Sequence, residues 1–164
     1  MKKRLPVMLL SCVIVCSSGY AKTIGFVCIY NSDAPQGTAD FITALETELF
    51  ELCFDHGVIT TSVEHIKGTS DRYADTAAVV KLFDSSLDYI AVLYCEYTPD
   101  SGQKPVGQRQ TIEWKQLRWK IVDFSSQAVL FEELLEPEKI PDAELKQKIR
   151  SAGSHIGSTI LNKL

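Results

Sequence analysis

The chain has 164 residues, of which 45% are hydrophobic and 23% are charged, with 17 basic residues against 21 acidic ones. This length and composition predict one globular domain that can bury a core of its own. The net charge of −4 excludes the basic footprint that nucleic-acid binding requires. Beyond the N-terminal segment, no apolar stretch approaches the roughly 20 residues of a membrane span.

The N-terminal segment has the three parts of a secretory signal peptide. A basic cluster, Lys2–Arg4, precedes the apolar stretch Leu5–Cys16, and small residues lead to a cleavage point after Ala21. The sequence therefore predicts a signal peptide over residues 1–21 and one exported, periplasmic domain over residues 22–164. Without the signal peptide, 14 basic residues stand against 21 acidic ones, a net charge of −7.

A second processing route is open at Cys12. The four residues that end at Cys12, Leu-Leu-Ser-Cys, resemble a loose bacterial lipobox. Lipidation at Cys12 would turn the exported protein into a membrane-anchored lipoprotein. Against this route, the apolar segment continues directly after Cys12, as expected within a signal peptide that is cleaved later.

The sequence of the first half of the mature chain predicts two successive strand–helix units. Thr23–Tyr30 is apolar on both parities, that is, at both its odd and its even positions, as in a strand covered on both faces. A helix over Thr38–Phe54 is expected to stop at Gly57. Val58–Ile66 predicts a second strand, and a second helix is expected near Asp75–Phe83.

The second half begins with a strand and then loses the helical connections. Tyr89–Tyr97 predicts a strand apolar on both faces, and Gln110–Asp123 and Ala128–Leu134 predict two further strands with no helix between them. A change of apolar parity within the longer strand predicts a bulge near Lys115–Gln116. The last helix is expected to run from near Asp142 to the C-terminus.

The order of these elements predicts the fold class. The order β-α-β-α-β-β-β-α indicates a single α/β domain, a mixed sheet of about five strands with helices packed on it. The first three strands should be parallel or mixed, and the next two should form a hairpin. The last helix should pack on the sheet through one apolar stripe, formed by Leu145, Ile149, Ala152, Ile156 and Ile160.

Three cysteines lie in the mature chain: Cys28, Cys53 and Cys95. An odd number with apolar neighbours favours buried thiols over a disulfide framework. If one bridge forms, Cys28–Cys95 is the candidate pair, because both residues lie in predicted central strands.

No catalytic or cofactor constellation stands out, and we expect no enzyme activity and no cofactor. Cys53 and His56 have a C-x-x-H spacing, with His65 nearby, but no second pair of ligands completes a zinc site. The loop Asp33–Thr38 occupies the place where flavodoxin-like proteins bind phosphate. A small-molecule or flavin-binding protein that uses this loop is therefore the alternative function.

Two aromatic residues are candidates for a partner surface. Tyr97 and Trp114 flank the long polar loop Thr98–Gly107, and aromatic residues dominate the energetics of protein interfaces. The adjoining hairpin is expected to end the sheet, and such an edge can accept a partner strand.

Three segments carry a family resemblance. Asp88–Tyr97, the hairpin Leu117–Phe131 and the closing helix Glu144–Leu164 together resemble the α/β domain shared by the TolB N-terminal region, LpoB-type activators of penicillin-binding proteins and CsgG-type secretion lipoproteins. The resemblance covers essentially the whole mature chain. It implies this group's fold and a non-enzymatic protein-binding or assembly role in the bacterial cell envelope, with an envelope protein as partner.

Overall fold

The computed structural model describes residues 21–34, 38–84, 87–98, 111–135, 138–141 and 144–164. Their elements follow one another as β1 (Thr23–Tyr30), α1 (Thr38–Asp55), β2 (Ile59–Ser62), β3 (Ile66–Lys67), α2 (Ser70–Ala74), α3 (Thr76–Val80), β4 (Tyr89–Tyr97), β5 (Thr111–Asp123), β6 (Val129–Leu135), β7 (Glu138–Pro141) and α4 (Leu145–Lys163). Residues 1–20 of the predicted signal peptide, which include Cys12, lie outside the described residues.

One mixed sheet organises the domain, as the sequence predicted. Its strand order is β2-β1-β4-β5-β6, while the short strands β3 and β7 pair with β1 and β5. β1 is parallel to β2, β3 and β4, and the β4–β5 and β5–β6 pairs are antiparallel. The expected single-domain α/β class, with a hairpin added to parallel strands, is confirmed.

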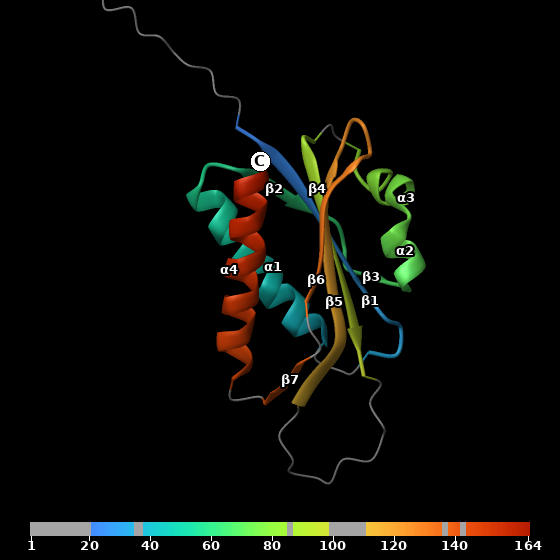
Figure 1. Cartoon of the computed structure of the whole chain (residues 1–164), viewed down its shortest axis with the longest axis vertical. Coiled ribbons are helices and arrows are strands. Elements are labelled where there is room, and N and C mark those ends of the chain that lie inside the picture. The colour runs from blue at the N-terminus through green and yellow to red at the C-terminus, as the bar shows by residue number, and fades with distance from the viewer. Residues whose placement is uncertain (1–20, 35–37, 85–86, 99–110, 136–137, 142–143) are drawn as a thin grey trace, which may run out of the picture.

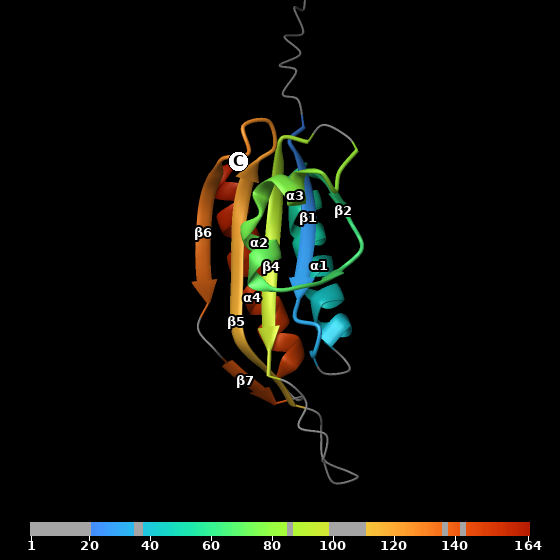
Figure 2. The same ribbon diagram turned by 90° about the vertical axis from the view of Figure 1, so that its right-hand side faces the viewer.

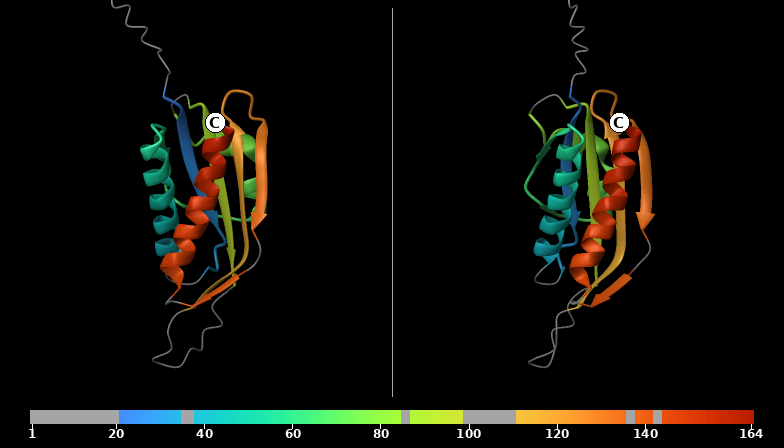
Figure 3. Two further views of the ribbon diagram at one scale, coloured as in Figure 1. Left: turned by 60° about the vertical axis from the view of Figure 1, so that its left-hand side comes forward. Right: turned by 90° about the vertical axis from the view of Figure 1, so that its left-hand side faces the viewer.

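Helices cover the two faces of the sheet unequally (Figures 1 and 3). The long helices α1 and α4 pack side by side on one face, and the short helices α2 and α3 lie on the other. β1 and β4 send alternate side chains into a core on each face. This arrangement explains why both strands are apolar on both parities.

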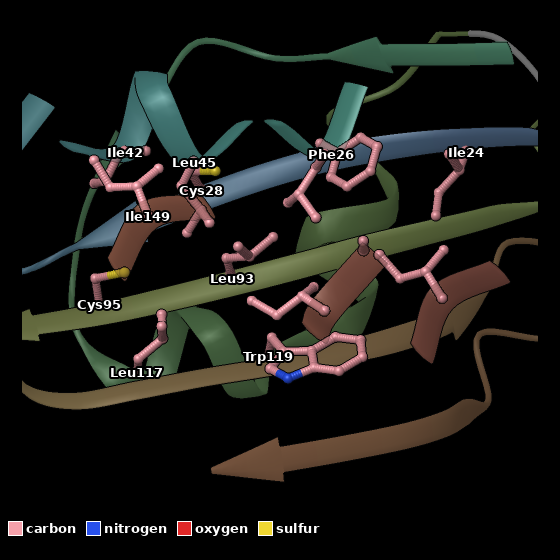
Figure 4. Close-up of a cluster of buried hydrophobic side chains, with 14 of the residues drawn as sticks. Ile24, Phe26, Cys28, Ile42, Leu45, Leu93, Cys95, Leu117, Trp119 and Ile149 are labelled. Carbon is pink, nitrogen blue, oxygen red and sulfur yellow. The ribbon is translucent and has the colours of Figure 1, made fainter. Parts of the chain in front are cut away.

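The larger core lies between the sheet and the pair α1–α4 (Figure 4). Trp119 of β5 and Phe26 of β1 are fully buried in it. From α4, the stripe predicted from sequence contributes Ile149, Ile156 and Ile160, all buried. The predicted docking of the last helix is confirmed.

Three local expectations differ from the structure. The single strand expected over Val58–Ile66 is two short strands, β2 and β3, separated by residues 63–65. The helix expected near Asp75–Phe83 is two short helices, because Asp75 ends α2 and its side chain accepts a hydrogen bond from Ala78 N at 2.9 Å to begin α3. The last helix was expected to start near Asp142 and begins at Leu145.

The predicted bulge in the long strand is confirmed. Glu96 of β4 pairs with Gln116, whereas Tyr97 pairs with Trp114, so Lys115 is an extra residue in β5. A second irregularity lies in β6, where Phe131 pairs with Ile121 and Val129 pairs with Val122, which leaves Leu130 as the extra residue. Each bulge increases the local twist of its strand.

Candidate functional site

β6 forms an edge of the sheet, and no strand pairs with its outer side among the residues that the structure describes. Figure 2 shows this strand at the side of the molecule, beyond the sheet area that α2 and α3 cover. Three of its apolar side chains are exposed: Val129 by 47%, Leu130 by 46% and Leu134 by 60%. An exposed apolar edge strand of this length can template pairing with another chain.

The face of β6 toward α4 is fastened to the domain. Phe131 packs against Trp119, with ring centroids 4.9 Å apart and ring planes tilted by 43°. The Glu133 carboxylate accepts a hydrogen bond from Trp119 Nε1 at 3.0 Å and lies 3.0 Å from His155 Nε2 of α4. These contacts hold the strand in one position, so its outer edge is preorganised.

The opposite face of β6 is only partly covered. Glu132 accepts hydrogen bonds from Arg118 Nη2 at 2.7 Å and from the Tyr73 hydroxyl at 3.1 Å. Burial and the neighbouring Glu132 carboxylate raise the pKa of Tyr73, so its hydroxyl stays protonated and remains a donor. Leu134 and Val129 flank Glu132 on this face, where they pair with Arg118 and Val122. The result is an apolar surface interrupted by a neutralised carboxylate.

Tyr97 is not part of an exposed surface, and the expectation that it binds a partner is wrong. Its side chain is fully buried, and its ring meets Phe41 edge to face with centroids 6.2 Å apart. Its backbone N–H donates to Asn31 Oδ1 at 2.8 Å. The cause is strand parity, because Tyr97 follows Leu93 and Cys95 on the face of β4 that α1 covers.

Trp114 stays a prediction. Its backbone pairs with Tyr97 and with Glu138 of β7, but its side chain lies outside the described residues.

The cleft beside the first loop differs in charge from a phosphate site. It has a volume of about 320 Å³ and lies at the ends of β1 and β4, where Asp33 and Glu96 are among its lining residues. Lys115 also lines it, but this side chain lies 3.8 Å from the Glu96 carboxylate. The Asn31 side-chain amide donates to Asp33 Oδ1 at 2.6 Å. Of the loop Asp33–Thr38, residues 35–37 lie outside the described residues.

The three thiols are free and buried. Cys28 pairs with Leu93 across β1 and β4, whereas Cys95 pairs with Tyr30. The two cysteines are therefore diagonal neighbours on parallel strands, with Cα atoms roughly 8 Å apart, whereas a disulfide needs about 4.4–6.8 Å. Figure 4 shows both side chains on the face covered by α1 and α4. The candidate bridge Cys28–Cys95 is not formed.

The C-x-x-H pair does not converge. Cys53 is fully buried, while His56 is exposed and its Nδ1 lies 2.8 Å from the Leu52 carbonyl oxygen. His65 instead lies beside Glu46 of α1 and Cys28 of β1. Sequence reasoning missed this grouping because its members lie far apart along the chain.

Within the described ranges, no helix is long and apolar enough to cross a membrane.

Comparisons with known proteins place this fold beside bacterial proteins of low sequence identity. TolB from Acinetobacter baumannii is 19% identical over 87% of this chain and 28% of that chain, with a TM-score of 0.44. Lipoprotein GNA1162 from Neisseria meningitidis is 14% identical over 86% of this chain and 99% of that chain, with a TM-score of 0.46. The PelC dodecamer from Paraburkholderia phytofirmans is 12% identical over 84% of this chain and 86% of that chain, with a TM-score of 0.46.

This chain therefore spans little more than a quarter of the TolB chain. A comparison with curated proteins found no match. One family model matches residues 23–164, which is nearly all of the chain that follows the predicted signal peptide. The chain belongs to this family, whose description is "Uncharacterised protein".

Proposed function

We propose that this chain is an exported, non-enzymatic protein-binding module of the bacterial cell envelope, and that its β6 edge accepts an extended strand of an envelope partner. The observation that supports this proposal most is that none of the described strands pairs with the outer side of β6, where Leu134 is exposed. Main-chain hydrogen bonds at such an edge supply affinity, and side-chain contacts on the two faces supply specificity. Export is supported by the sequence pattern of residues 1–21.

The opposite edge of the sheet is a weaker candidate for strand addition. β2 has four residues and β3 has two, and residues 63–65 interrupt the edge between them. Short and broken edge strands are a common protection against pairing. β6 offers the regular run Phe131–Leu135, long enough to pair with a partner strand.

The chemistry of β6 limits the partner. Cross-strand neighbours of Leu134 are expected to be apolar, because side-chain pairs on one face stabilise a sheet. The net charge of −7 for residues 22–164 favours a basic segment through long-range attraction. We infer a partner strand that alternates apolar and basic residues.

A photo-crosslinking amino acid at position 134, compared with the same group at position 54, tests this proposal. Phe54 is a matched control because it is 79% exposed but lies on α1. We expect position 134 to crosslink in cells to one envelope protein through a single extended segment, and position 54 not to do so. Crosslinks to a second copy of this chain would instead identify β6 as a dimer interface.

The substitution Leu134→Lys measures the same contact quantitatively. An interface anchor is worth about 2 kcal/mol, so binding to the crosslinked segment should weaken about 30-fold. Phe54→Lys should leave that binding unchanged. Equal binding by Leu134→Lys and the unsubstituted protein, with both folded by circular dichroism, would exclude β6 as the docking edge.

A further inference from the structure

Three side chains with metal-binding atoms meet at the edge of the sheet opposite to β6. They are Cys28, Glu46 and His65, called here the Cys–Glu–His cluster. One ligand atom from each, the thiol sulfur, a carboxylate oxygen and a ring nitrogen, lies within 4.8 Å of the other two. His65 Nε2 and Glu46 Oε2 are 3.1 Å apart. β1, α1 and the segment just before β3 each supply one member.

A bulge in the edge strand brings His65 into this cluster. Phe26 of β1 pairs with Ser62, and Ile29 pairs with Ile66, so three residues lie opposite Val27 and Cys28. Without an extra residue, side chains would alternate across the sheet with a period of two. Val63 and Ile66, three positions apart, instead both pack on the core beneath α2 and α3. The insertion lets His65 reach the α1 face, and bulges often re-aim side chains in this way.

The cluster contains a polar atom without a partner. Glu46 Oε1 is buried and accepts no hydrogen bond within the described part of the chain, although Oε2 of the same carboxylate contacts His65. The side chains of Glu46 and His65 are only 14% and 19% exposed. Buried carboxylate oxygens are normally hydrogen-bonded or bound to a cation.

The charges of the three ligands suit a bound divalent cation. A divalent cation bound by two anionic ligands and one neutral imidazole gives a net charge of zero, which suits a buried position.

We propose that Cys28, Glu46 and His65 bind a borderline divalent transition-metal ion of the Zn²⁺ class. Thiolate, imidazole and carboxylate are the ligands that zinc prefers. A tetrahedral ion with bonds of about 2.0–2.3 Å holds its ligand atoms about 3.3–3.6 Å apart, within reach of the present spacing after a small side-chain shift. On binding, the Cys28 thiol loses its proton to solvent and its sulfur forms the metal bond.

The consequence is a site with three protein ligands and one open coordination position. Structural zinc sites usually have four protein ligands, so the open position is available to water or to a ligand supplied from outside. The ion would also tie the break between β2 and β3 to α1. This site is independent of the proposed strand addition, because β6 lies at the other edge of the sheet.

Titration of the exported, chelator-treated protein with Zn²⁺ and Co²⁺ tests the proposal. We expect one equivalent of Zn²⁺ by calorimetry, and a near-ultraviolet thiolate-to-cobalt charge-transfer band with Co²⁺. Cys28→Ser should abolish the band, and Cys28→Ser, Glu46→Gln and His65→Ala should each weaken Zn²⁺ binding by more than the 10–100-fold typical of outer-shell changes. Cys28→Ser and Glu46→Gln are nearly isosteric, and the His65 side chain is partly exposed, so we expect each variant to fold. Circular dichroism checks this.

Two control variants separate the cluster from other soft ligands. Cys53→Ala removes a buried thiol, and His56→Ala removes an exposed imidazole, both outside the cluster. Both should bind Zn²⁺ within about 3-fold of the unsubstituted protein. The absence of Zn²⁺ binding, or a cobalt band that persists in Cys28→Ser, would overturn the proposal and leave Glu46 and His65 as a hydrogen-bonded pair. Loss of binding in His56→Ala would equally overturn it.

Discussion

The packing of α4 against α1 depends on a glycine, and Gly157→Val tests this dependence. Gly157 is buried in α4, and a Cβ atom at this position would overlap Leu52 Cδ2 and lie 3.5 Å from Leu49 Cδ2, both on α1. Valine adds two further methyl groups in the same direction. A side chain at position 157 therefore fits only if the Leu52 side chain turns away or the two helices move apart.

The expected loss of stability follows from two opposing effects. Replacing glycine within a helix gains about 0.3–0.5 kcal/mol of intrinsic propensity for valine. Overpacking a close contact costs about 1–3 kcal/mol. The net loss is about 0.5–2.7 kcal/mol, which lowers Tm by about 1–11 °C in a domain of this size.

Thermal unfolding followed by circular dichroism measures this loss, with Ser154→Val as the matched control. Ser154 is exposed on the same helix, so its substitution changes propensity without changing packing. In the Gly157→Val background, Leu52→Ala should restore about 1 kcal/mol, because it removes the overlapping methyl group. A Gly157→Val protein as stable as the parent, with no coupling to Leu52, would refute the close-packing argument.

Three further predictions concern stability and chemistry. Asp88 accepts hydrogen bonds from Thr23 N at 2.7 Å and Thr23 Oγ1 at 2.9 Å, which lower its pKa. Ionised Asp88 contributes at most about 1 kcal/mol to the free energy of unfolding, because the group is exposed. This contribution is present above the unfolded-state pKa of about 3.9 and is lost as the pH falls through the lower pKa of the folded state. Urea unfolding should therefore show that Asp88→Asn is less stable than the parent at pH 7 and equally stable near pH 2. The buried thiols should react slowly with Ellman's reagent until guanidinium unfolds the protein, because burial raises the pKa of Cys53 to about 11 and of Cys95 to about 12. A fast reaction of the folded protein with the reagent would contradict the burial of these thiols. Tyr97→Ala should lower the free energy of unfolding, measured with urea, by about 3–5 kcal/mol, as for other large buried aromatic side chains. Tyr97→Phe should lower it by less than about 1.5 kcal/mol. A Tyr97→Ala protein as stable as the parent would mean that Tyr97 lies outside the core.

The sequence by itself determined the elements whose pattern is local. Thr23–Tyr30 and Tyr89–Tyr97 are apolar on both parities, and both are strands covered on two faces. The spacing of apolar residues in the last helix fixed which face docks. The parity change near Lys115 located the bulge in β5. Each of these patterns reflects the fixed period of a helix or a strand, so neighbouring residues alone carry the information.

Only the tertiary structure decided what covers each face and what meets across elements. Tyr97 continues the parity of Cys95, but its burial depends on α1 reaching the end of β4. Glu46 and His65 are 19 positions apart and meet only because a bulge lies opposite Cys28. The exposed edge of β6 is likewise a property of strand order, which follows from long-range packing. The period of an element determines which of its residues share a face, whereas the layer packed against that face depends on the whole chain.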